Sequence, residues 1–116
     1  QLALGNCYKR GRGIGKDNVE AFKCYQKAAN QGYAEAQYIL GDCYSYGDIV
    51  SENRVEAFKW YQRAADQGYA EAQYRLGKYY KFGWGIDTDK DLARKWFTKA
   101  SAQGLSDAKL ALDQLR

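Results

Sequence analysis

A repeat of 36 residues is the feature that most restricts the fold of this chain. Leucine-glycine pairs, tyrosines and glycines recur at this spacing: Leu4-Gly5, Leu40-Gly41 and Leu76-Gly77, then Tyr8, Tyr44 and Tyr80, then Gly11, Gly47 and Gly83. A fixed period of roughly 20–50 residues indicates a solenoid or a propeller. A residue type kept in every copy is expected to be structural, whereas one that changes between copies is free to carry function.

The apolar positions within one period predict two α-helices. In the first helix they follow the spacing of a single helical stripe: Ala36, Ile39, Leu40, Cys43, Tyr44 and Gly47. A second stripe runs through a later segment: Ala57, Tyr61, Ala64, Ala65 and Gly68. The alternation typical of strands is absent. Each period is therefore predicted to be a helix pair, called helix A and helix B.

Glycines in two kinds of position support this assignment. Gly47 and Gly68 follow helix A and helix B, where glycine takes the left-handed conformation that ends a helix. Gly41 lies inside helix A, where glycine costs roughly 1 kcal/mol relative to alanine. Its recurrence in every copy predicts a close contact where helix B crosses, with the small Ala57 opposite.

The start of helix B carries capping signals. Capping boxes are predicted for two copies: Asp17-x-x-Glu20 and Asn53-x-x-Glu56. In the third copy Asp89 is kept but Leu92 replaces the glutamate, so half of the box is lost. One apolar residue in each A–B linker is expected to anchor its loop: Ile14, Val50 and Ile86.

The chain is predicted to be one domain. Its parts are repeat 1 at 1–33, without its first three positions, repeat 2 at 34–69, repeat 3 at 70–105 and a final helix at 106–116. The other helices are expected over 17–30, 34–46, 53–66, 70–82 and 89–102. Asp113 replaces the helix-A glycine, which predicts a polar capping helix. Because Gln1 aligns with the interior of a helix A, we expect a fragment of a larger protein, whose exposed N-terminal repeat face would allow self-association.

Charge and hydropathy argue against two classes of partner. The net charge of +4 is spread over helix faces, without the basic stripe of a nucleic-acid-binding protein. No apolar run approaches the roughly 20 residues of a membrane span. We therefore expect neither a nucleic-acid partner nor membrane insertion, while the cellular compartment stays undetermined.

Few residues in this chain are suited to catalysis or metal binding. There is no histidine, which excludes Ser-His and Cys-His nucleophiles and His-containing zinc sites. Three local patterns resemble functional motifs but lack the other residues that those motifs require. They are Ser106-x-x-Lys109, as in serine β-lactamases, the acidic run 87–91, as in calcium loops, and the glycines at 11, 13 and 15, as in phosphate-binding loops. Cys7, Cys24 and Cys43 form no C-x-x-C pair and are interpreted as buried free thiols. We expect no catalytic residue, no metal and no cofactor.

Two sequence patterns resemble a known family. The pattern A-x-x-x-L-G-x-x-Y-x-x-G, followed by A-F-K-W-Y-Q-R-A-A-x-x-G, is similar to the Sel-one-like repeat, a relative of the tetratricopeptide repeat. Gly68 stands where tetratricopeptide repeats commonly have proline. The resemblance covers essentially the whole chain. It implies a right-handed superhelix of antiparallel helix pairs that works as an adaptor or scaffold.

If the fold is tetratricopeptide-like, helix A lines a concave face that is available to a protein or peptide partner. The residues expected there are Tyr38, Asp42, Ser45, Tyr46, Tyr74, Lys78, Lys81 and Phe82, with Leu2, Asn6, Lys9 and Arg10 in the first copy. Aromatic residues interleaved with lysines suit an extended peptide with acidic groups. The alternative for Tyr38 and Tyr74 is that they pack between repeats.

Trp84 is a further candidate partner contact. It lies between two glycines in a loop, and its counterparts Arg12 and Asp48 show that the repeat does not require an aromatic residue there. The alternative is that it folds back onto the helix at 89–102.

The sequence thus predicts an all-α solenoid of three helix-pair repeats plus a C-terminal capping helix. Its predicted function is a non-catalytic protein-interaction module that binds a peptide or partner surface on its concave helix-A face. The alternative is a structural spacer or oligomerisation segment with no ligand of its own.

Overall fold

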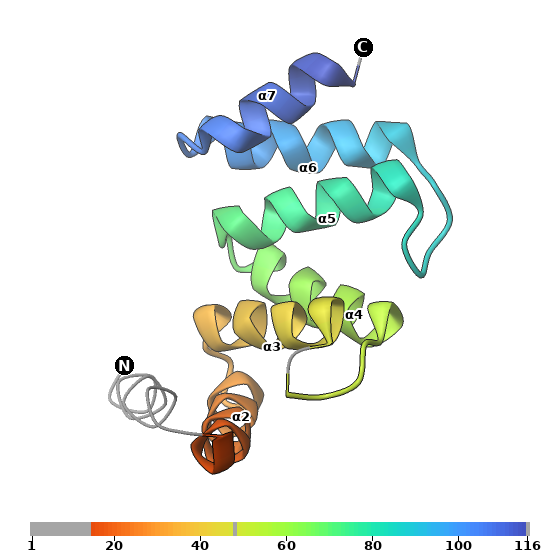
Figure 1. Ribbon diagram of the computed structural model, residues 1–116. Helices are drawn as coiled ribbons and strands as arrows, with labels where there is room; N and C mark the ends of the chain where they lie inside the picture. The colour runs from red at the N-terminus through yellow and green to blue at the C-terminus, as the bar shows by residue number, and fades with distance from the viewer. Residues whose placement is uncertain (1–14, 48, 116) are drawn as a thin grey trace.

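The helices of the protein are stacked side by side along one direction (Figure 1). The computed structural model describes residues 15–47 and 49–115. The elements in this part of the chain are α2 (Gly15–Asn30), α3 (Ala34–Tyr46), α4 (Arg54–Asp66), α5 (Ala70–Phe82), α6 (Lys90–Ala102) and α7 (Ser106–Gln114). All of them are α-helices, and no strand occurs among these residues.

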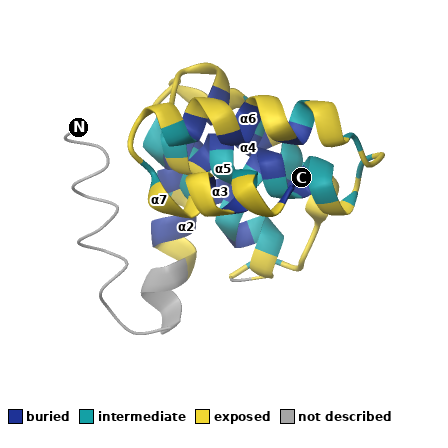
Figure 2. Ribbon diagram, turned by 90° about the horizontal axis from the view of Figure 1, so that it is seen from above, coloured by how far each residue is buried: buried dark blue, intermediate teal, exposed yellow. Residues whose placement is uncertain are grey.

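Each helix packs mainly on the next one in sequence, from α2 on α3 through to α6 on α7. The core is therefore a column of small clusters between neighbouring helices. Buried residues lie on the inward faces, and the outer helix surfaces are exposed (Figure 2). This arrangement is the expected one for a solenoid, in which a repeat contacts only its neighbours. The predicted all-α solenoid is confirmed.

The predicted helix boundaries agree closely with those observed. The helices at 34–46 and 70–82 match α3 and α5 at both ends. Helices α4 and α6 begin one residue later than predicted, because Asn53 and Asp89 are their N-caps. Helix α2 begins two residues earlier than predicted, and α7 ends at Gln114.

The capping boxes are only half formed. The Asn53 side chain accepts a hydrogen bond from the Glu56 amide at 3.0 Å, as an N-cap should. The Asn53 amide itself donates to the Tyr44 carbonyl at 2.8 Å, so it is not available to the Glu56 side chain. Asp89 repeats this geometry, with its amide donating to the Tyr80 carbonyl at 2.9 Å. The reciprocal half of the box was wrongly predicted, because this amide ties helix B to the last turn of helix A.

The close approach at the helix-A glycine is real, but its partner is not the predicted one. A Cβ at Gly41 would lie 2.6 Å from Cδ1 of Tyr61, and one at Gly77 would lie 2.5 Å from Cδ1 of Phe97. The predicted neighbour was Ala57, whose small size suggested the contact. The bare backbone instead receives the flat ring of a helix-B aromatic residue one turn further on.

Glutamine side chains link consecutive repeats. Gln73 is only 5% exposed and donates from Nε2 to the Ala65 carbonyl at 3.3 Å. Its Oε1 accepts from Nε2 of Gln103 at 3.0 Å. Gln37 makes the same two bonds one repeat earlier, with Ala29 and Gln67. These bonds satisfy a polar group that repeats 2 and 3 bury at the same place.

The outcomes for the linkers and cysteines differ. Val50 and Ile86 are partly buried against core clusters, as expected of loop anchors. Cys24 is disulfide-bonded, so its interpretation as a free thiol is wrong. Cys43 is buried in the core beside α2 and α4.

Other expectations fall outside the described residues: Leu2, Asn6, Cys7, Lys9, Arg10, Ile14, the side chain of Asp17 and the N-terminal self-association face.

The described residues contain neither a membrane-spanning helix nor a metal-binding cluster. None of the helices within 15–47 and 49–115 is both long and apolar enough to cross a membrane. The same residues contain no group of three or more His, Cys, Asp and Glu side chains placed to hold a metal ion.

Candidate functional site

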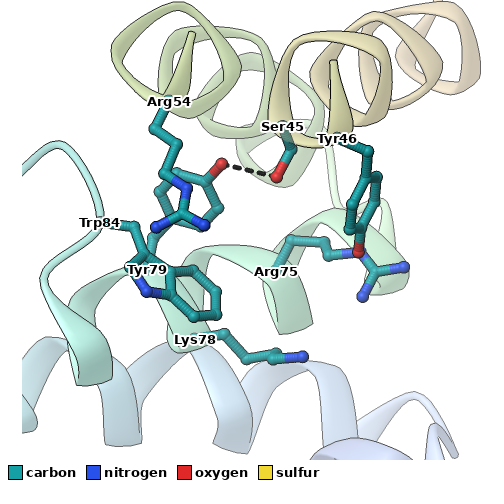
Figure 3. Close-up of a pocket in the computed structure, with 7 residues that line it drawn as sticks. All are labelled: Ser45, Tyr46, Arg54, Arg75, Lys78, Tyr79 and Trp84. Atoms are coloured by element: carbon teal, nitrogen blue, oxygen red, sulfur yellow. Dashed lines mark hydrogen bonds between the residues drawn. The ribbon is translucent and has the colours of Figure 1, made fainter. Parts of the chain in front are cut away.

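A surface pocket lies between the two A helices of repeats 2 and 3 (Figure 3). Its volume is about 120 Å³. Seven residues line it: Ser45, Tyr46, Arg54, Arg75, Lys78, Tyr79 and Trp84. The lining therefore combines three cations with three aromatic side chains and one serine.

Four elements supply these residues. Ser45 and Tyr46 lie in the last turn of α3, and Arg54 is the first residue of α4. Arg75, Lys78 and Tyr79 have the i, i+3, i+4 spacing that places them on one face of α5. Trp84 follows Gly83, whose left-handed conformation (φ 71°) ends α5 and directs the loop back towards α4.

Trp84 lies among aromatic and cationic side chains rather than projecting alone from its loop. Its ring stacks on Phe82 at a centroid distance of 4.9 Å and meets Tyr79 edge-on at 5.4 Å. The Arg54 guanidinium lies 4.8 Å from the ring centroid, and the Lys78 amine lies 5.9 Å from it. These ring contacts are with α5 and the start of α4, whereas the alternative placed Trp84 on the helix at 89–102. One part of Trp84 is thus packed, while another part forms a pocket wall.

Two of the three cations already have carboxylate partners. Arg75 Nε lies 3.5 Å from Asp42 Oδ1, and Arg54 Nε lies 3.2 Å from Glu52 Oε2. The Lys78 amine differs, because no carboxylate of the described residues lies within ion-pair distance of it. Its neighbours are instead the rings of Tyr74, at 5.4 Å, and Trp84.

The electrostatic surroundings of Lys78 disfavour its positive charge. Burial lowers the pKa of Lys78 below its ordinary value, and the adjacent Arg75 cation lowers it further. The Asp107 carboxylate opposes this shift, and Lys81 adds a smaller lowering effect. An anion bound in the pocket would relieve this repulsion.

One side of the pocket is held in place by hydrogen bonds. The Tyr79 hydroxyl donates to Ser45 Oγ at 2.8 Å, a bond that links α5 to α3 (Figure 3). Beneath it, the Tyr61 hydroxyl donates to the Asp42 carboxylate. Burial raises the pKa of both phenols, and Asp42 adds to the shift at Tyr61. The phenols of Tyr61 and Tyr79 are therefore uncharged, and hydrogen bonds hold them in place.

The structure places the predicted partner-contact residues in two groups. Tyr46, Lys78 and Trp84 line the pocket, and Phe82 stacks against Trp84 at its edge. Lys81 lies beside this group, with its amine 5.0 Å from the Phe82 ring.

The remaining three predicted residues have packing contacts. Tyr38 is partly buried and its ring contacts Tyr61 and Tyr69, while its hydroxyl lies 3.4 Å from Arg75 Nη2. Asp42 is held by Tyr61 and Arg75, as described above. Tyr74 packs on Phe97, with a centroid distance of 5.9 Å. The rings of Tyr38 and Tyr74 thus pack on residues of their own repeats, and the Tyr38 hydroxyl reaches Arg75 of the next repeat.

Arg54 and Arg75 are pocket residues that the sequence analysis missed. Arg75 takes the place of Ile39, which belongs to the predicted apolar stripe of helix A in repeat 2, and so it was not among the candidates. Arg54 lies in the segment with the predicted capping box, a pattern that indicates where a helix begins and not which side chains bind a partner. Variation between copies was the signal that applied to both, since Arg54 corresponds to Asn18 and Lys90.

The repeated helix pairs and their consecutive packing define an α-helical solenoid. The family model for the Sel1 repeat matches residues 1–33, 34–69 and 70–105. The chain therefore belongs to the Sel1 repeat family, in agreement with the resemblance noted from its sequence. Proteins built from these repeats are generally protein–protein interaction modules, and the fold is typically a non-catalytic scaffold.

Solved structures give the same result. A Sel1 repeat protein from Oxalobacter formigenes is 40% identical, with a TM-score of 0.85 over 96% of this chain and 84% of its own. The protective antigen c5321 of uropathogenic Escherichia coli, which has an SLR fold, is 28% identical with a TM-score of 0.85 over 95% of this chain and 24% of its own. Helicobacter pylori cysteine rich protein B shares the fold at 24% identity, with a TM-score of 0.81 over 97% of this chain and 90% of its own. No curated protein sequence matches the chain.

Proposed function

We propose that this chain is a non-catalytic interaction module that binds a peptide segment of a partner protein across α3 and α5. The observation that carries the proposal is the pocket between these helices, with its cationic and aromatic lining. Aromatic and arginine side chains are the residues that most often dominate protein interfaces.

Exposed aromatic residues extend the surface beyond the pocket. Tyr46 is 64% exposed and Phe82 is 51% exposed, at the ends of α3 and α5 respectively. The two occupy the same position in successive repeats, and the first copy carries Arg10 there, so the repeat does not require an aromatic residue at this position. A surface position that differs between copies while the core is kept supports a role in recognition rather than in folding.

Pocket size supports a peptide rather than a small-molecule ligand. Sites for drug-sized ligands and cofactors commonly measure about 300–1,000 Å³. The pocket here is about 120 Å³, which is room for one side chain of a longer ligand. A structural spacer without a ligand would need neither this pocket nor the exposed aromatic pair.

The proposal is tested by affinity capture from a lysate of the source organism at physiological salt. The immobilised chain is compared with a Lys78→Glu/Phe82→Ala variant, which changes the proposed surface at two partly or largely exposed positions. A matched control, Lys59→Glu/Leu110→Ala, makes the same kinds of change on α4 and α7. Circular dichroism melts establish that all three proteins are folded.

The proposal expects a polypeptide that the parent and the control retain and the surface variant loses. Equal retention by all three proteins would move the binding site away from α3 and α5. If nothing is retained by any of the folded proteins, the spacer alternative is favoured.

A further inference from the structure

The pocket carries one uncompensated positive charge. Its cations are Arg54, Arg75 and Lys78, of which the first two form ion pairs with Glu52 and Asp42. Outside the pocket lining, Asp107 raises the pKa of Lys78 and Lys81 lowers it, so the effects of these two charges oppose each other. The remaining charge is that of Lys78, so the site matches a ligand group with a single negative charge.

The walls of the pocket restrict the shape of that group. Arg54 and Trp84 stand on one side, and Tyr46 with Arg75 stands on the other, while Lys78 extends along the floor (Figure 3). A volume of about 120 Å³ holds a few waters or one short side chain, since a liquid water occupies about 30 Å³. A carboxylate that pairs with the lysine amine can lay its methylene groups against the Trp84 ring, whose centroid is 5.9 Å from that amine.

Aromatic residues lie on both sides of this pocket. Tyr46 stands at one wall (Figure 3), and Phe82 stacks on Trp84 of the other wall and is 51% exposed. A peptide that enters the pocket with a side chain can continue in both directions over apolar surface. A peptide that ends in the pocket would leave one of these aromatic residues unused.

We propose that the pocket is an anchor site for the carboxylate of an Asp or Glu side chain within an extended peptide, with Lys78 as the principal charged contact. This inference rests on the proposed function, because it names the chemistry of the partner at that surface. Lys78 supplies the charge, and Trp84 and Tyr46 supply the flanking apolar contacts.

The experiment starts with selection of peptides from a random-sequence display library on the immobilised chain. Selected sequences are synthesised with amidated C-termini, and their affinities are measured by fluorescence polarisation. Each is compared with copies in which Asp or Glu is replaced by Asn or Gln, or by phosphoserine, and with a copy that has a free C-terminal carboxylate and no acidic side chain. The proteins are the parent, Lys78→Gln, Phe82→Ala and the control Lys59→Gln.

The inference expects selected peptides to share an acidic residue flanked by apolar residues. Amide replacement of that residue and Lys78→Gln should each raise the Kd at least about tenfold, and the two changes together should cost little more than either alone. Lys59→Gln should leave the Kd unchanged. The amidated acidic peptide should bind more tightly than both the phosphoserine copy and the copy with only a terminal carboxylate.

Other outcomes overturn the inference in distinguishable ways. Peptides that bind, lose affinity with Phe82→Ala and show no acidic preference would leave the proposed function standing and remove the carboxylate anchor. Preference for phosphoserine or for the terminal carboxylate would replace the ligand group named here. If the folded chain selects no peptide at all, both the anchor and the proposed function fail.

Discussion

Gly77 of α5 lies directly against the ring of Phe97 of α6, close enough that a Cβ on Gly77 would be 2.5 Å from the ring atoms Cδ1 and Cε1. Gly41 has the same relationship with Tyr61 one repeat earlier. The contact lets the backbone of helix A pack on a flat ring that is fully buried. It explains why each repeat keeps a glycine in the middle of a helix, where glycine is otherwise unfavourable.

Gly77→Ala should destabilise the protein although alanine is the better helix former. The gain in helix propensity is about 1 kcal/mol, whereas overpacking against a buried ring typically costs about 1–3 kcal/mol. We expect a net loss of up to about 2 kcal/mol of unfolding free energy, measured by urea denaturation, and loss of cooperative folding for Gly77→Leu. Phe97→Leu in the Gly77→Ala background should recover part of the loss. Additive effects of the two substitutions would contradict the proposed contact.

Gln73→Leu should lower stability by about 1–3 kcal/mol, because it removes two hydrogen bonds that link the repeats, each worth about 0.5–1.5 kcal/mol. Thermal unfolding followed by circular dichroism gives the measurement. Gln114→Leu on exposed α7 is the matched control and should have little effect. An equally small effect at Gln73 would mean that the glutamine bonds between repeats contribute nothing to stability.

Trp84→Ala should lower the unfolding free energy by about 1–2 kcal/mol, because the ring stacks on Phe82 and packs edge-on against Tyr79. The corresponding fall in melting temperature is several degrees for a chain of this size. Phe82→Ala should cost less, since half of that side chain is exposed. An unchanged melting temperature for Trp84→Ala would mean that these ring contacts do not stabilise the fold and would favour a role for Trp84 in partner binding alone.

Stability should fall at alkaline pH because of buried phenols. Burial, followed by the Glu35 and Glu71 carboxylates, raises the pKa of Tyr69 from 10.0 to about 12. The folded-state pKa lies above the unfolded value, so this contribution is fully present below pH 10 and is lost as the pH rises towards 12. Urea denaturation across this range should show a falling unfolding free energy, with a smaller fall in Tyr69→Phe. A flat profile in the parent protein would contradict the assignment.

The fold was predictable because its determinants recur along the chain. The leucine-glycine pairs and the terminal glycines gave helix ends that match α3 and α5 at every boundary. What the sequence did not predict depends on contacts between different elements. The partner of Gly77 is set by the crossing of α5 and α6, and spacing along one helix does not reveal it. The disulfide of Cys24 is another contact that cysteine spacing did not indicate.

The candidate site was predictable only in part, for the same reason. Tyr46, Lys78 and Trp84 were selected because they vary between copies, and they line the pocket. Arg75 also varies, but its position in the apolar stripe concealed it. Its side chain reaches the Asp42 carboxylate on α3, so its placement depends on how two repeats are stacked. Comparison of equivalent positions across all copies, including the apolar stripe, would have found it.

Chemical-shift mapping tests the binding surface most directly. The isotope-labelled chain is titrated with a peptide selected from the display library, and backbone amide and indole signals are followed by NMR. The account predicts that the largest changes occur at Ser45, Tyr46, Lys78 and the Trp84 indole, with little change at Trp60 and Trp96 in the B helices. Changes confined to the outer surfaces of α4 and α6 would contradict it.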